Sequence, residues 1–148
     1  QRLIRELYMK KIVLLLFISL FFNCFELPDF QAKYDITGKN WNSITMSSTY
    51  IDKFDPIIFE DDRSITLNLL PFTGNFSNLS GFYTQNENLI SFTIEGIYTN
   101  GGSTSNFTIT CTDAQLNELG DKIEGFYLIE FVSDFTAENG TIEFNSFI

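Results

Sequence analysis

The chain has 148 residues, a length that fits a single domain, and its 44% hydrophobic and 19% charged residues exclude a disordered or low-complexity protein. The sequence contains no His, so the commonest neutral-pH base and metal ligand is missing, and the net charge of −10 opposes the phosphate neutralisation that nucleic-acid binding requires. Aromatic residues make up 16% of the chain, which favours strands over helices. We therefore expect a mainly β protein that binds no nucleic acid and has no catalytic residues, metal site or cofactor.

The N-terminal segment has the pattern of an export signal. Met9 is followed by Lys10 and Lys11, and then by an apolar run over 12–22 that is interrupted only by Ser19. A cationic start followed by an apolar run is typical of a secretory signal, and this run is well short of the about 20 residues that a membrane-spanning helix needs. We predict that translation starts at Met9 and that residues 1–8 are upstream sequence.

Cys24 follows the apolar run after Asn23. Together with the two lysines and the run, this cysteine resembles the end of a bacterial lipoprotein signal peptide. The resemblance implies that residues 9–23 are removed, that Cys24 carries the lipid, and that 24–33 is a tether in front of a β domain over 34–148. It also implies a cell-envelope protein held in the membrane by lipid, in the outer membrane if the cell is Gram-negative. An ordinary signal peptide with an incidental cysteine and an uncleaved anchor remain open alternatives.

The exported part is more acidic than the whole chain. Without residues 1–23 the chain loses four basic residues and one acidic residue, so its net charge falls from −10 to −13. If Cys24 carries lipid, Cys111 is the remaining thiol. Alternation with Phe107 and Ile109 places it on an inward face, and we expect a buried structural cysteine rather than a nucleophile. A disulfide between Cys24 and Cys111 is the alternative.

Short alternating segments dominate the chain from Tyr34 onward. Apolar and polar residues alternate over 65–69, 90–94 and 107–111, which predicts half-buried antiparallel strands. Turn residues separate such segments, and we predict hairpin connections at 85–88, at 100–102 and at Asn139–Gly140.

One segment departs from this alternation. Asp113 is a suitable helix cap, and the apolar residues after it recur every three or four positions, at Ala114, Leu116, Leu119 and Ile123. The pattern predicts one short helix in the C-terminal third. The expected fold is therefore a single small antiparallel β-barrel or strongly bent sheet with one short helix.

Two family resemblances accompany this fold. The segment Gly38–Trp41 with Gly81–Tyr83 resembles the small lipocalin-like domains of bacterial lipoproteins. The order of two strands over 65–69 and 107–111, a helix and a terminal hairpin is similar to META-type envelope domains. Both resemblances imply an envelope protein.

The candidate binding residues are aromatic. Flat rings with a polar tip can stack on a ligand or line an apolar cavity, and core packing explains them equally well. The acidic run over 60–62 lacks the alternating spacing of a calcium loop and is interpreted as a solvated turn. The side chains that a ligand would contact are Trp41, Tyr83, Tyr98 and Tyr127.

Two functions from different classes follow. The first is a lipid-anchored envelope protein whose non-catalytic β domain binds another envelope protein or maintains the envelope. The second is a lipocalin-like carrier of a small apolar ligand. An enzyme is disfavoured because the missing His removes the usual nucleophile pairs.

Overall fold

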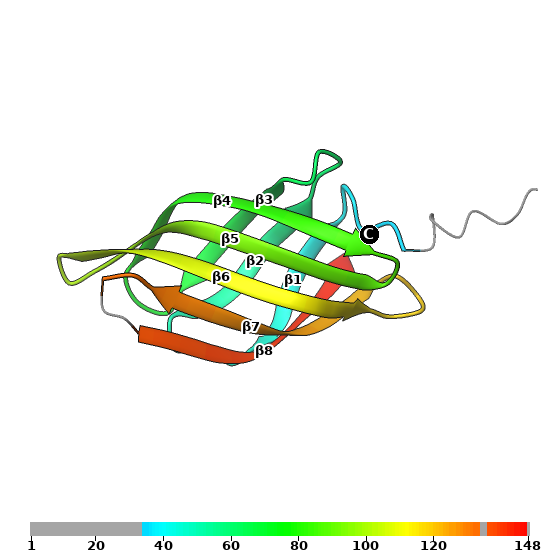
Figure 1. The fold of residues 1–148 in the computed structure, drawn as a ribbon. Coiled ribbons are helices and arrows are strands. Elements are labelled where there is room, and N and C mark those ends of the chain that lie inside the picture. The colour runs from blue at the N-terminus through cyan, green and yellow to red at the C-terminus, as the bar shows by residue number, and fades with distance from the viewer. Residues whose placement is uncertain (1–33, 134–135, 148) are drawn as a thin grey trace, which may run out of the picture. The chain divides into compact units, whose positions relative to one another are not determined.

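The computed structural model describes residues 34–133 and 136–147, and these belong to one compact unit, Lys33–Ile148. Eight antiparallel strands form a nearly closed barrel (Figure 1). The strands are β1 (Asn40–Met46), β2 (Ile51–Phe59), β3 (Ile65–Pro71), β4 (Asn75–Asn86), β5 (Leu89–Asn100), β6 (Ser103–Leu116), β7 (Lys122–Phe131) and β8 (Thr136–Phe147). The predicted mainly β class and barrel are confirmed.

The strands follow one another around the barrel in the order β3-β2-β1-β8-β7-β6-β5-β4. Pairing of the first strand with the last closes the sheet, with Trp41 opposite Ser146 and Asn42 opposite Asn145. The boundary between β3 and β4 is the seam of the barrel. In the described part of the chain, the seam is joined by an isolated bridge between Ser64 and Phe82, next to which the Tyr83 amide donates to the Arg63 carbonyl at 3.0 Å.

The predicted alternation is confirmed by burial. Each predicted segment, over 65–69, 90–94 and 107–111, lies in a strand and turns its apolar residues inward. Removal of these side chains from water is the main favourable term in folding, so the alternation selects which face of each strand lines the interior.

The predicted helix is wrong. β6 continues to Leu116, and a turn that carries Leu119, 81% exposed, leads directly into β7. A bulge in β6 explains the misleading pattern. Asp113 has a φ of +52° and the register shifts after Cys111, so an extra residue separates two inward side chains and imitates the three-residue spacing of a helix. The helix that formed part of the META-type resemblance is therefore absent from the described residues.

The predicted turn at Asn139–Gly140 is also wrong. Both residues lie inside β8, where Gly140 stands opposite Tyr127. A Cβ atom at position 140 would clash with the Ser47 hydroxyl oxygen and lie 3.0 Å from the Tyr127 ring, so glycine serves close approach here and not a turn. The hairpins predicted at 85–88 and 100–102 are confirmed, because Asn86 pairs with Leu89 and Asn100 pairs with Ser103.

The two ends of the barrel carry different contacts. At the Trp41 end, where the described chain begins, the buried Ile36 accepts a hydrogen bond from Trp41 Nε1 at 3.2 Å. At the Tyr98 end, which carries the β5–β6 hairpin (Figure 1), rings contact one another. Tyr50 packs 5.8 Å from Tyr98 and 4.5 Å from Phe131, measured between ring centroids.

Candidate functional site

The four predicted ligand-contact residues are buried, and each has a hydrogen-bond partner. Trp41 donates to Ile36 as above, and the Tyr83 hydroxyl donates to the Glu60 carbonyl at 2.9 Å, so both engage the Trp41 end. The Tyr98 hydroxyl donates to the Thr73 carbonyl and the Tyr127 hydroxyl donates to Glu138 Oε1, each at 3.1 Å, at the opposite end. The structure therefore places these residues in two pairs rather than in one site.

Phenylalanine rings fill the space between the two pairs. Phe54 lies 5.4 Å from Phe144, and Phe92 lies 6.2 Å from both Phe144 and Phe59, which joins β2, β5 and β8 through the interior. These separations are in the range of favourable ring packing. The barrel is thus packed with side chains where these rings lie.

Glu138 organises the Tyr98 end. Its carboxylate accepts hydrogen bonds from the Thr49 amide at 2.9 Å, from the Thr49 hydroxyl, and from Tyr127. Burial by itself would raise the pKa of Glu138, but the hydrogen bonds that it accepts from Ser48, Thr49 and Tyr127 outweigh burial and lower that pKa. This carboxylate is a structural acceptor that ties the β1–β2 connection to β8.

Cys111 lies inside the barrel. Burial raises the pKa of its thiol to about 12, so the thiolate that a nucleophile requires is not formed at neutral pH. Cys24, the predicted lipid site, lies outside the described residues.

The acidic run over 60–62 forms a turn between β2 and β3. Asp62 Oδ1 accepts hydrogen bonds from the Ser64 hydroxyl and from the Ser64 amide, the latter at 2.9 Å, and these bonds, first that of the hydroxyl, lower the pKa of Asp62. The Arg63 guanidinium lies 5.2 Å from the centre of the Tyr83 ring. Among residues 34–133 and 136–147, no group of three or more Cys, Asp or Glu side chains is placed to hold a metal ion.

A groove of about 390 Å³ lies on the outer face of the barrel, across β6, β7, β8 and β1. Two bulges flank it. One is the bulge of β6 beside Asp113, and the other lies in β1, where the register against β8 shifts between Ser43 and Thr45. Bulges bend a strand and increase its local twist, so the groove lies between two strands that are bent in this region. The groove is lined by Thr45, Thr112, Asp113, Gln115, Glu124, Gly125, Phe126, Thr141, Ile142 and Glu143.

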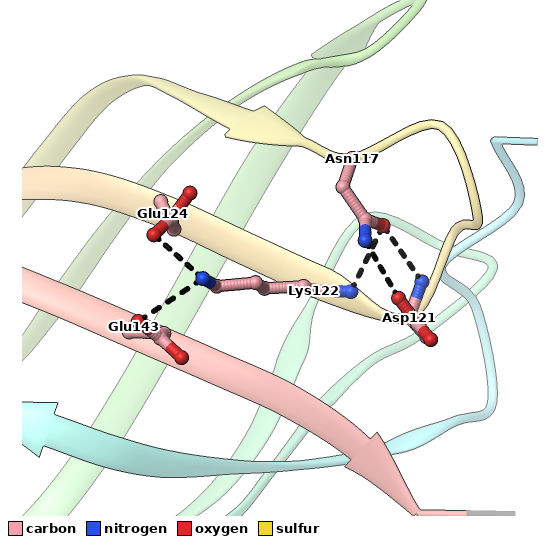
Figure 2. A network of polar contacts seen from close by, with 5 residues as sticks. All are labelled: Asn117, Asp121, Lys122, Glu124 and Glu143. Atoms are coloured by element: carbon pink, nitrogen blue, oxygen red, sulfur yellow. Dashed lines mark hydrogen bonds and ion pairs between the residues drawn. The ribbon is translucent and has the colours of Figure 1, made fainter.

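A charged network borders the groove (Figure 2). Lys122 Nζ lies 2.8 Å from Glu124 Oε1 and 3.3 Å from Glu143 Oε2, and these glutamates stand opposite each other on β7 and β8. The hydrogen bond to Glu124 is the largest cause that raises the pKa of Lys122, so the ammonium stays charged. The neighbouring turn is held by Asn117, whose Nδ2 donates to Asp121 Oδ1 at 2.7 Å.

Sequence reasoning did not find this groove. The unbroken apolar run over 126–129 of β7 was a signal for exposed apolar side chains. A strand with one buried face turns every second residue outward, so half of this run must face solvent. Phe126 is accordingly 75% exposed, and Leu128 also faces outward. The opposing residues on β6 and β8 come from distant parts of the chain and gave no local signal.

Comparison with known proteins gives no relatives, since no family model, curated protein or solved structure matches the chain. In the described ranges, no helix is long and apolar enough to cross a membrane.

Proposed function

We propose that the chain is an exported, lipid-anchored binding protein of the bacterial cell envelope whose non-catalytic β domain meets its partner through the outer surface. The export and anchor components rest on the order of Lys10–Lys11, the apolar run over 12–22 and Cys24. Multiple acyl chains on one cysteine give durable membrane attachment, whereas one chain is marginal.

The observation that carries the binding component is the packed interior. Phe144 contacts both Phe54 and Phe92 between the four buried polar aromatic side chains, whose N–H and O–H groups all have partners within the protein. Close-packed interiors leave few voids larger than a water molecule. A packed barrel leaves its outer surface for recognition.

Metabolic labelling with an alkyne fatty acid tests the anchor. The wild-type chain and a Cys111→Ser control, which keeps Cys24, should both be labelled, and Cys24→Ser should not. Equal labelling of Cys24→Ser would refute the anchor, because the lipid would then be attached elsewhere.

A carrier of a small apolar ligand is the second candidate. It is favoured by the eight-stranded barrel and by the seam between β3 and β4, because barrels of this size either fill with side chains or hold one small ligand. The test is titration of the full chain in detergent with an environment-sensitive fatty-acid probe. Saturable binding at one probe per chain with quenching of Trp41 fluorescence would place the carrier first, whereas our proposal predicts no saturable interior site.

A further inference from the structure

The groove on the outer face combines an exposed aromatic ring with polar groups of both hydrogen-bonding kinds. Phe126 is 75% exposed and stands opposite Thr141 of β8, with the β6 bulge on its other side. The ring lies in a groove of about 390 Å³, a volume in the range of small-molecule binding sites. The flat ring offers an apolar face for stacking.

The polar lining supplies acceptors and donors in one cross-strand row. Gln115, Glu124, Glu143 and Thr45 are successive register partners on β6, β7, β8 and β1. Lys122 uses Oε1 of Glu124 and Oε2 of Glu143, so each carboxylate keeps its second oxygen as an acceptor. The Gln115 carboxamide and the threonine hydroxyls can both donate and accept.

We infer that this groove binds a saccharide, with Phe126 stacked on a sugar ring and Glu124, Glu143 and Asp113 accepting from its hydroxyls. A sugar presents an apolar face of C–H groups and a rim of hydroxyls that both donate and accept, which matches the ring and the mixed row. The inference rests on the proposed function and names the ligand class for its outer surface.

A cationic ligand is the competing occupant, because three carboxylates line the groove. Lys122 already sits between Glu124 and Glu143, and Figure 2 shows both dashed contacts to its single ammonium. A cation that used the free oxygens of Glu124 and Glu143 would lie close to the Lys122 ammonium, and the two like charges would repel each other. A neutral polyol keeps the network intact and uses the free oxygens.

The test is a glycan array of bacterial, plant and animal oligosaccharides probed with the full chain in detergent. The oligosaccharide with the strongest signal is then titrated against wild type, Phe126→Ala and Asp113→Asn. Asparagine is chosen because it tolerates the positive φ of position 113. Phe82→Ala is the matched control, since Phe82 is an outward phenylalanine, 57% exposed, on β4, which contributes no residue to the groove.

We expect Phe126→Ala to weaken binding by about tenfold or more and Asp113→Asn by a smaller factor, while Phe82→Ala leaves affinity unchanged. Affinity should change little in 1 M NaCl, because the contact is neutral.

An array without signal, an equal loss in Phe82→Ala, or Phe126-dependent binding of a Lys- or Arg-rich peptide in place of a sugar would overturn the inference. Thermal melts of each variant establish that it is folded. Failure here leaves the labelling of Cys24 unaffected, so the two proposals fail separately.

Discussion

Phe126 and Tyr127 are neighbours on β7 with opposite environments. Tyr127 is 2% exposed, and its hydroxyl donates to Glu138 at the Tyr98 end of the barrel. Phe126 points outward into the groove beside Glu124. Both sides of the strand thus pair an aromatic ring with a carboxylate, but one pair is satisfied within the fold and the other faces solvent.

Aromatic content alone therefore does not locate a binding site in this chain. Inward rings contribute to stability, and an outward ring in a hollow is available for recognition. Substitutions in the interior should therefore change the free energy of unfolding, while substitutions in the groove should leave it almost unchanged.

Phe92→Ala should have the largest effect on stability. The ring is buried and contacts Phe59 and Phe144, so its loss removes buried apolar surface and leaves a cavity. We expect a loss of about 3–5 kcal/mol in the free energy of unfolding, measured by urea denaturation. A loss below about 1 kcal/mol would mean that the interior is not packed there, which would favour the carrier function.

Gly125→Ala should destabilise by about 1–3 kcal/mol. A Cβ atom at this position would lie 2.7 Å from the Cβ of Ala114, on the inward side of the β6 bulge. In a strand with free space at this position, Gly→Ala would raise the free energy of unfolding by about 0.4–1 kcal/mol. The sign of the change therefore shows whether β7 packs closely on the bulge. The exchange Ala114→Gly with Gly125→Ala should recover part of the loss. No recovery would argue against close packing of β7 on the bulge.

Glu138→Gln should cost about 1 kcal/mol at neutral pH, because a carboxylate that accepts several hydrogen bonds is replaced by an amide. The folded pKa of Glu138 is lowered from the usual 4.5, so its stabilisation is present above that value and is lost as pH falls through the folded pKa. Denaturation between pH 7 and pH 3 should show a steeper acid loss for wild type than for the variant. Parallel curves would contradict the assigned role.

Phe126→Ala should change the free energy of unfolding by less than about 0.5 kcal/mol, because the ring is mostly in water. The measurement is urea denaturation beside Phe92→Ala. A large loss would show that Phe126 belongs to the packing of the fold, and the contrast between the two faces of β7 would then disappear.

The sequence predicted much of the fold and little of the site. Alternation over 90–94 and 107–111 located β5 and β6. The polar tetrapeptide over 85–88 located the hairpin between β4 and β5. The same reasoning failed at Asp113, because a bulge and a helix both place apolar residues three positions apart. It placed the four ligand-contact candidates in one group, although burial and hydrogen bonding divide them between two ends.

Local sequence patterns were enough to predict the β class, the inward face of regular strands and two of the hairpins, because period-two alternation and turn chemistry are local properties of the chain. The pairing of β1 with β8, the bulges and the groove between them became visible only in the folded chain. Barrel closure joins residues about a hundred positions apart, such as Trp41 and Ser146, and the position of a bulge depends on which neighbours it must fit. Gly125 and Gly140 show this dependence, since each is required by a side chain on another strand or loop and not by its own backbone.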